Sequence, residues 1–382
     1  TNIEAHSYHS FCVKFYDRKC YRDTNIRDLL ISDKQRLRPF SFDVFIFDEA
    51  QDVTPLYYQL ICKIYRDNGF RSRHWNGRRN RKRKQDLNRK SKQDLKRKSK
   101  QDRHRNKRPI HPAKICVLGD KYQSIYGFND ADERFVTFAE RCFQFNPYSW
   151  SSRNLSQSFR VPREISDFVN QCMLQQERIV STKIAKKKPR YLLCNSFAES
   201  FGDSEGTSDT FNEVLHYLNA GYAPHDIFIL APSVRSVLSP VRRLENLIKK
   251  RLDGIPVYVP VSDDEKLDQD VLENKMIFST FHQVKGLERK VVIVFGFDES
   301  YFKYYKRDVN PNICPNELYV AVTRAQERLT VVHHFQNDYL SFLDVKKLKH
   351  RAHVLKKCSI QTDSVNHTMD DGKKTYDTPV TD

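Results

Sequence analysis

A short apolar run that ends in a cluster of acids is the feature that most constrains the fold of this chain. Residues 44–47 read Val-Phe-Ile-Phe, and residues 48–52 read Asp-Glu-Ala-Gln-Asp. Such a run is typical of a strand in a parallel sheet, and α/β proteins bind ligands where these strands end. Adjacent carboxylates there suit a nucleotide site, with Asp48 holding Mg²⁺ and Glu49 orienting a water. The alternative is a solvated helix N-terminus, where the helix dipole favours acidic residues.

Four further segments follow the acidic cluster in a fixed order. They are residues 114–128 (Lys-Ile-Cys-Val-Leu-Gly-Asp-Lys-Tyr-Gln-Ser-Ile-Tyr-Gly-Phe), 155–160 (Leu-Ser-Gln-Ser-Phe-Arg), 279–288 (Ser-Thr-Phe-His-Gln-Val-Lys-Gly-Leu-Glu) and 319–325 (Tyr-Val-Ala-Val-Thr-Arg-Ala). With residues 48–52, they resemble in order and spacing motifs II to VI of the UvrD/Rep family of superfamily-one DNA helicases. Residues 7–11, Ser-Tyr-His-Ser-Phe, resemble the Thr-Phe-His element of that family.

Alternating apolar runs and helical periodicities predict an α/β fold with parallel sheets. Helices are expected at residues 55–66, 162–174 and 209–218, and strands at 44–47, 115–118, 226–230, 275–278, 291–295 and 329–332. The resemblance implies two RecA-like parallel-sheet domains. We expect the first at residues 1–150, incomplete at its amino end, the second at 151–340, and a polar tail at 341–382. The short spacings between motifs imply that the accessory domains called 1B and 2B are absent or minimal.

The resemblance also implies which residues catalyse ATP hydrolysis. Asp48 would hold Mg²⁺, Glu49 would act as the base, and Gln123 would sense the γ-phosphate. Arg160 and Arg324 would supply cations from the second domain, Arg324 as an arginine finger. These roles agree with the chemistry of phosphoryl transfer, which is catalysed by positioning and by neutralising charge around the γ-phosphate.

Three further residues would bind the cofactor, which the resemblance identifies as ATP with Mg²⁺. Phe159 occupies the position of a tyrosine that stacks on adenine in the family, and phenylalanine keeps the aromatic face. Glu288 would take the ribose hydroxyl, and Gly286 belongs to the same motif.

Contacts with DNA are implied for residues of both domains. Tyr8, with His9 beside it, and Phe128 stand where the family places aromatic platforms, and stacking on a base contributes about 1–3 kcal/mol. Thr280 and His282 would touch the DNA backbone or link it to the ATP site. The expected partner is single-stranded DNA, or a duplex with a single-stranded tail. The alternative for Phe128 is core packing, and a single histidine is more often structural.

The chain departs from the family in lacking a phosphate-binding loop. No Gly-x-x-x-x-Gly-Lys-Ser/Thr occurs, and the one Gly-Lys pair is Gly372-Lys373. Two functions therefore stay open. The first is an ATP-dependent DNA helicase or translocase, with 3′-to-5′ polarity implied by the resemblance, although this chain alone should hydrolyse ATP poorly. The second is a truncated, non-catalytic helicase that binds single-stranded DNA or a partner protein. The RNA-helicase branch is disfavoured by the residues that follow Gly119-Asp120.

The basic charge of the chain is concentrated in one low-complexity insert. Residues 71–108 contain 19 Lys or Arg and 3 Asp, a net charge of +16, whereas the remaining residues are near neutral at +2. The insert repeats Lys-Gln-Asp with a period of 8 residues. It could be a neutral expansion, a nuclear-import signal or an electrostatic grip on nucleic acid.

Cysteine usage and hydropathy bear on the compartment. Nine cysteines without Cys-x-x-Cys spacing suggest reduced thiols, and zinc is disfavoured. No apolar run reaches the roughly 18 residues that a membrane span needs, and no signal peptide opens the chain. We therefore expect an intracellular protein without a membrane partner, nuclear if the host is eukaryotic.

Overall fold

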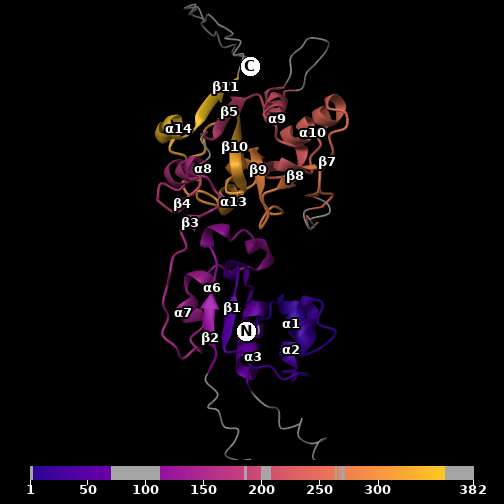
Figure 1. Cartoon of the computed structure of the whole chain (residues 1–382), viewed down its shortest axis with the longest axis vertical. Helices are drawn as coiled ribbons and strands as arrows, with labels where there is room; N and C mark the ends of the chain where they lie inside the picture. The colour runs from indigo at the N-terminus through magenta and orange to yellow at the C-terminus, as the bar shows by residue number, and fades with distance from the viewer. Residues whose placement is uncertain are drawn as a thin grey trace, which may run out of the picture.

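The computed structural model describes residues 3–69, 112–184, 187–198, 208–262, 265, 267 and 272–357. Figure 1 shows two α/β units stacked along the long axis. The first unit contains a two-stranded sheet and the second a seven-stranded sheet. The predicted insert at 71–108 lies outside the described residues.

The first unit is built on two parallel strands. β1 (Val44–Phe47) pairs with β2 (Lys114–Val117), with Val44 opposite Lys114 and Phe47 opposite Val117. This pairing confirms the predicted parallel arrangement. The helices are α1 (Tyr8–Phe15), α2 (Asp23–Ile31), α3 (Pro55–Asp67), α6 (Arg134–Thr137) and α7 (Ala139–Cys142), with one-turn helices η1 (Ala50–Asp52), η4 (Lys121–Gln123) and η5 (Gly127–Asn129).

Helix α3 follows the acidic cluster, as the sequence predicts, and residues at its N-terminus explain where it begins. The Thr54 hydroxyl accepts a hydrogen bond from the Tyr57 amide at the N-cap, and Pro55 occupies the first turn. Leu60, Ile61 and Ile64 recur at helical spacing and are buried against the sheet and against α1 and α2. The helix therefore packs its apolar face against the two strands of the first unit.

The second unit is a parallel sheet in the order β11-β5-β10-β9-β6-β8-β7. Every pairing between neighbours in this sheet is parallel, which confirms the predicted α/β class. Its strands are β5 (Arg190–Cys194), β6 (Ile227–Ala231), β7 (Val257–Tyr258), β8 (Met276–Thr280), β9 (Arg289–Val294), β10 (Ala325–His334) and β11 (His353–Lys356). A separate parallel pair joins β3 (Gln157–Ser158) to β4 (Val180–Ser181).

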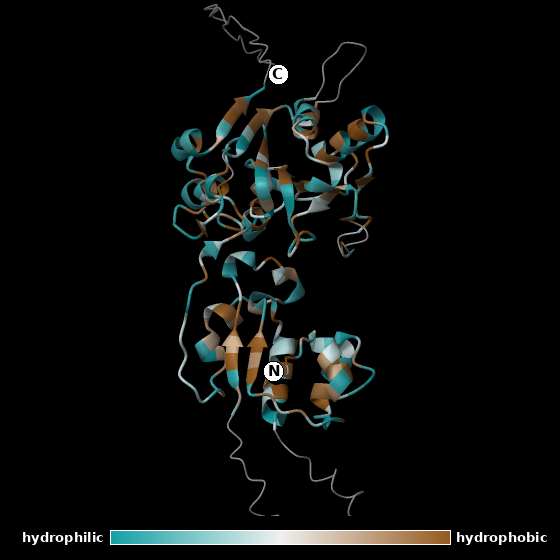
Figure 2. Cartoon of the chain, viewed as in Figure 1, coloured by the Kyte–Doolittle hydropathy of each residue, from teal (hydrophilic) through white to brown (hydrophobic). Residues whose placement is uncertain are grey.

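Two hydrophobic cores lie on the two faces of this sheet. Along β6, Phe228 and Leu230 contribute to one core, and Ile227 and Ile229 to the other, as the alternation of side chains in a strand requires. Figure 2 shows β1 and β2 as largely apolar, whereas part of β10 is hydrophilic. The helices are α8 (Arg163–Phe168), continued by the π-turn η6 (Val169–Met173), α9 (Asp209–Asn219), α10 (Pro240–Arg251), α12 (Ser300–Tyr304), α13 (Asn316–Val322) and α14 (Val345–Arg351), with the short η7 (Pro224–Asp226).

The predicted polar tail at 341–382 is wrong for its first part. Residues Val345–Arg351 form α14, and β11 pairs in parallel with β5 at the edge of the large sheet. Phe342 and Leu348 are buried in the core. These few apolar residues are buried in the core, and β11 pairs its backbone with β5 along one edge. Residues 358–382 lie outside the described residues.

No helix among the described residues is long and apolar enough to span a membrane.

Candidate functional site

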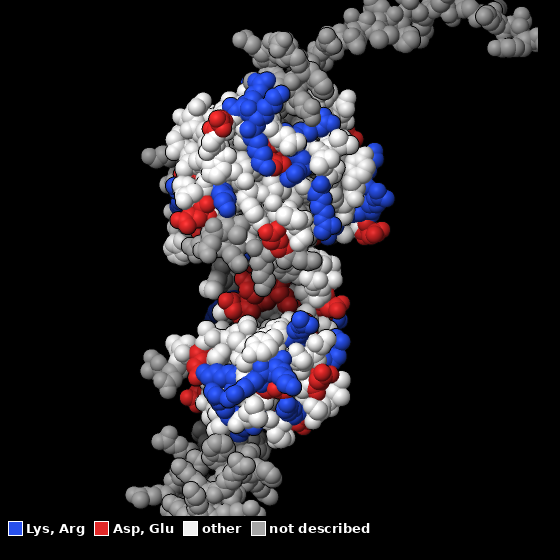
Figure 3. All heavy atoms as spheres, turned by 90° about the vertical axis from the view of Figure 1, so that its right-hand side faces the viewer, with Lys and Arg blue, Asp and Glu red and all other residues white. Residues whose placement is uncertain are grey.

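The carboxyl ends of β1 and β2 point toward the second unit (Figure 1). Asp48 and Glu49 follow β1 and are exposed to solvent, whereas Gln51 is fully buried. The Glu49 amide donates to the Asp48 carboxylate at 2.9 Å, and Glu49 has a left-handed φ of 50°. Figure 3 shows Asp and Glu side chains gathered at the waist between the units. The predicted Mg²⁺ ligand and base therefore lie at a strand end that faces the waist.

Gln51 joins the turn after β1 to the turn after β2. Its side chain donates to Glu49, and its amide oxygen accepts from the backbone of Asp120 at 3.0 Å. The Ala50 amide donates to the carbonyl of Leu118 at 2.9 Å. The two turns can come this close because residue 119 is a glycine, since a Cβ there would collide with Gln51 Oε1. The two turns form one compact edge that positions Glu49.

The donor set at this edge fits a magnesium ion that arrives with a nucleotide. Among the described residues, no group of three or more His, Cys, Asp or Glu side chains could hold a metal. Mg²⁺ usually takes one or two protein carboxylates and completes its shell with water and phosphate oxygens. Asp48 and Glu49 supply two adjacent carboxylates that remain exposed to such a ligand.

Arg324 and Gln123 meet across the two units. Arg324 Nη2 lies 3.5 Å from Gln123 Oε1, while Nε donates to the carbonyl of Val320 at 3.0 Å. The guanidinium is 1% exposed, and burial, with repulsion from Arg160, lowers its pKa to about 10. It therefore remains charged at neutral pH. The structure brings together two of the predicted catalytic residues, one from each unit.

The remaining predicted cofactor residues lie in the second unit. Glu288 accepts from Gln326 Nε2 at 2.6 Å and from Arg160 Nη1 at 3.5 Å, so it is held from two sides. Phe159 is 76% exposed, which leaves its ring free to stack on a ligand. Gly286 has a φ of 83°, a left-handed conformation that glycine adopts without strain, and it turns the chain between β8 and β9.

Phe128 and the half-buried His282 lie side by side in the predicted DNA-binding set. Their rings meet edge to face at 5.3 Å, and Phe128 is 67% exposed, so core packing does not explain Phe128 here. Thr280 is buried at the end of β8, and its hydroxyl donates to Gln283 at 3.1 Å. The two roles expected for Thr280, a contact with the DNA backbone and a link from DNA to the ATP site, stay predictions.

Tyr8 and His9, two further members of the predicted DNA-binding set, lie on α1 of the first unit. The Tyr8 ring stacks on Tyr57 at 4.5 Å, and burial raises its pKa to about 12. His9 lies 3.0 Å from Asp23. One face of the Tyr8 ring is therefore already occupied by Tyr57.

Lys285 is the residue of this site that the sequence reasoning missed. It stands between His282 and Gly286 in the same motif, and that position was the signal that could have identified it. Its ammonium group contacts Asp52 Oδ2 at 2.5 Å, the carbonyl of Gln123 at 2.8 Å and Glu49 Oε2 at 3.8 Å. It therefore adds a buried cation from the second unit to the acidic edge of the first.

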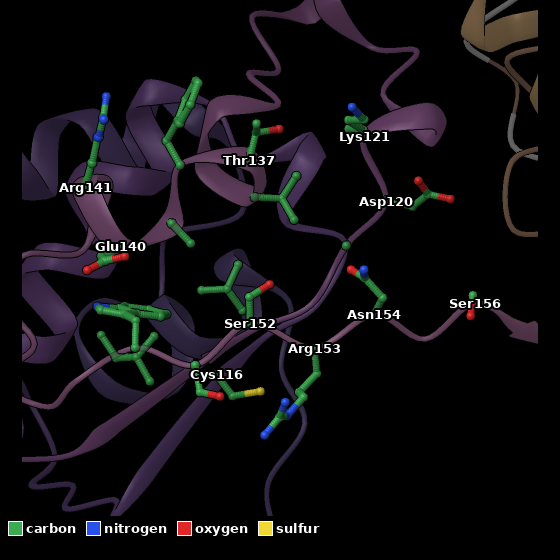
Figure 4. A pocket seen from close by; sticks show the side chains of 18 of the residues that line it. Cys116, Asp120, Lys121, Thr137, Glu140, Arg141, Ser152, Arg153, Asn154 and Ser156 are labelled. Carbon is green, nitrogen blue, oxygen red and sulfur yellow. The ribbon is translucent and has the colours of Figure 1, made fainter. Parts of the chain in front are cut away.

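A polar cavity of about 1170 Å³ lies beside β2 (Figure 4). Its walls include Cys116 on β2, Asp120 and Lys121 after that strand, and Arg153 on the segment that leads to the second unit. Neither Asp48 nor Glu49 lines it. The cavity thus borders the candidate site without containing the paired carboxylates.

A model of the family described as "UvrD-like helicase C-terminal domain" matches residues 40–336, a span that includes both the acidic edge and Arg324. Among solved structures, the C-terminal domain of a possible DNA helicase from Lactobacillus plantarum WCFS1 matches with 18% identity and a TM-score of 0.33, covering 52% of this chain and 98% of that one. That overlap is too weak to support a statement about fold or function.

No curated protein matches the chain. The family match covers most of the sequence, and the residues that it spans converge from both units on one edge. The chain belongs to the family of UvrD-like helicase C-terminal domains.

Proposed function

We propose that the chain is the motor part of an ATP-dependent DNA helicase or translocase that moves along single-stranded DNA, with 3′-to-5′ polarity implied by the family resemblance. Family membership supports a helicase-related function and nucleic-acid binding in general. The observation that carries the finer proposal is the contact of Arg324 with Gln123 across the two units, with Lys285 touching both Gln123 and Glu49.

The arrangement suggests how these residues would act on ATP. Bound Mg²⁺ would neutralise charge on the phosphates, and Asp48 would hold it. Glu49 would orient the attacking water and accept its proton. Gln123 and the charged Arg324 would stabilise negative charge on the transferred phosphoryl oxygens. Because Arg324 comes from the second unit and Gln123 from the first, hydrolysis would be coupled to relative movement of the units.

Single-stranded DNA would contact the exposed ring of Phe128, beside His282. We expect Phe128→Ala to weaken binding of fluorescein-labelled oligo(dT) by about 5- to 100-fold, the loss of one stacked base. Fluorescence anisotropy at fixed salt measures this, because affinity for nucleic acid depends strongly on salt. Phe138→Ala is the matched control, since Phe138 is also exposed in the first unit. Equal affinities of the two variants would contradict the assignment of Phe128.

The hydrolytic part is tested with Glu49→Gln, in a form of the protein that carries a phosphate-binding loop ahead of residue 1. Removing the base should lower oligo(dT)-stimulated ATP hydrolysis by a factor of about 10²–10⁴ and leave nucleotide binding nearly unchanged. Glu133→Gln, another exposed acid of the first unit, should retain normal turnover. Near-normal turnover of Glu49→Gln would remove Glu49 from the role of base.

The second candidate function is a non-catalytic module that binds single-stranded DNA or a partner protein. The exposed ring of Phe128 beside His282 supports it, because stacking on a base requires no ATP hydrolysis. A chain that binds oligo(dT) through Phe128 and shows no DNA-stimulated hydrolysis, even with a phosphate-binding loop supplied, would support this alternative.

A further inference from the structure

Lys285 reaches from the second unit into the first and is almost completely buried. It lies in the loop of residues 281–288, between β8 and β9, and its side chain is 7% exposed. Its ammonium group contacts Asp52, in the turn after β1, and the carbonyl of Gln123, in the turn after β2. One side chain therefore ties the ends of both strands of the first unit to a loop of the second.

Two carboxylates lie close to the ammonium group of Lys285, so a neutral side chain at this position would leave their charge uncompensated. A buried cation is costly unless its hydrogen bonds and charge are compensated. Lys285 has Asp52 at 2.5 Å and Glu49 at 3.8 Å, and lies 5.1 Å from the centre of the Tyr126 ring. Burial raises the pKa of Asp52, and the hydrogen bond from Lys285 opposes that rise. Without Lys285, Asp52 would lose the cation that compensates its buried charge.

The same loop carries residues proposed to contact DNA. The carbonyl of His282 accepts a hydrogen bond from the Tyr126 hydroxyl at 3.0 Å, and the His282 ring meets Phe128. The loop at 281–288 is thus fixed to the first unit at Tyr126 and Phe128, and by Lys285 at the acidic edge. Lys285 and His282 thus contact the first unit from the same short loop, Lys285 at Asp52 and Glu49, and His282 at Tyr126 and Phe128.

We propose that Lys285 is a positioning residue that couples the acidic edge at Glu49 and Asp52 to the DNA-facing loop at 281–288, an inference that rests on the proposed function. Lys285 touches neither substrate in this assignment. It acts by holding the two turns of the first unit and the loop of the second in one arrangement, so that occupancy of one site changes the other.

Hydrogen exchange measured by mass spectrometry on the full chain tests whether Lys285 holds the turns of the first unit and the loop at 281–288 together. Lys285→Met should speed exchange of amides in residues 120–128 and in 281–288 about tenfold, while β6 and β9 keep their protection. Lys285→Arg, which keeps a cation, should stay within about threefold of the wild type. Lys303→Met is the matched control, since Lys303 lies on α12 and its ammonium group packs over the neighbouring Tyr304 ring.

Unchanged exchange of 120–128 in Lys285→Met would overturn the proposal, because the effect would then be confined to the loop of the second unit. Should Lys285→Met fail to fold, Asp52→Asn replaces it. Asp52→Asn removes the partner charge and should loosen the same two segments, and protection equal to the wild type in that variant would also overturn the proposal.

Adding oligo(dT) tests the coupling. In the wild type, bound DNA should slow exchange in 281–288 and also in 48–53. In Lys285→Met, it should protect 281–288 alone. Equal transmission to 48–53 in both proteins would overturn the coupling. A wild type that does not bind oligo(dT) would instead contradict the proposed function, while the exchange of the DNA-free variants would still report on the role of Lys285.

Discussion

The residues of the predicted site differ strongly in burial. Arg324 and Thr280 are almost inaccessible, whereas Glu49, Phe128 and Phe159 are exposed. The Arg324 guanidinium is occupied by backbone carbonyls of its own unit and reaches the first unit through Gln123. At the residue scale, the site therefore has an exposed acidic side and a buried cationic side.

His333 is a buried residue whose protonation is linked to stability. It is 1% exposed, with the Tyr191 hydroxyl 2.7 Å from Nδ1 and the Asn337 carbonyl 2.8 Å from Nε2. A neutral imidazole satisfies both partners. Burial lowers its pKa below the ordinary value of 6.5, and the nearby Asp298 and Asp338 only partly oppose this. The unfolded chain therefore binds a proton at a pH where the folded chain does not.

The lowered pKa of His333 determines how stability changes with pH. The stability that neutral His333 contributes is complete above about pH 6.5 and is lost as the pH falls below it. We expect His333→Gln, whose amide can serve both partners, to lose less stability than the wild type between about pH 7.5 and 5.5. Urea unfolding at several pH values measures this. His353→Gln, with an exposed side chain, should match the wild type, and identical pH slopes for all three proteins would contradict the linkage.

At the element scale, the carboxyl-terminal helix and strand are part of the second domain's core. β11 extends the sheet beside β5, and α14 packs its Leu348 against the larger core. Strand β11 has only two apolar residues, Val354 and Leu355, and neither is fully buried. Its stability comes from the hydrogen bonds to β5 and from the helix that precedes it.

Leu348→Ala tests this contribution. Truncating a fully buried leucine should lower the free energy of unfolding by about 2–5 kcal/mol, through lost burial and the cavity that remains. Leu155→Ala is the matched control, because Leu155 is 86% exposed and should change stability by less than about 0.5 kcal/mol. A cost for Leu348→Ala no larger than the control would mean that α14 is not docked in solution. Urea unfolding of the two variants makes the comparison.

The central strands were the elements that sequence reasoning predicted best. β6, β8 and most of β9 are buried on both faces, so they appear as continuous apolar runs. β10 is longer than the expected 329–332 because it starts at Ala325, and its register shifts between Ala325 and Arg328. In that first part, Ala325 pairs with Arg289 and Arg328 with Val291 of β9, and hydropathy does not reveal this pairing.

At the scale of the whole molecule, the two units meet through apolar and polar contacts. Ile125 of the first unit is buried in the core of the second unit, and Tyr122 and Tyr126 pack against that core. Asn316 of α13 donates to the carbonyls of Lys121 and Ser124, and Arg178 pairs with Asp120 at 3.0 Å. Together with Lys285 and Arg324, these contacts place several cations and amide groups of the second unit on the turns after β1 and β2. Opening this interface would therefore expose apolar side chains as well as break these polar contacts.

The sequence by itself determined the fold class, the order of the main strands and the residue types at the site. Apolar runs followed by acids or glycines indicate where a buried strand lies and where it ends, because this pattern is carried by residues adjacent in the chain. Only the tertiary structure decided that Lys285 forms a salt bridge with Asp52, that Tyr8 stacks on Tyr57, and that β11 pairs at the edge of the sheet. Each of these depends on contacts between residues far apart in sequence, whose distances no local pattern encodes.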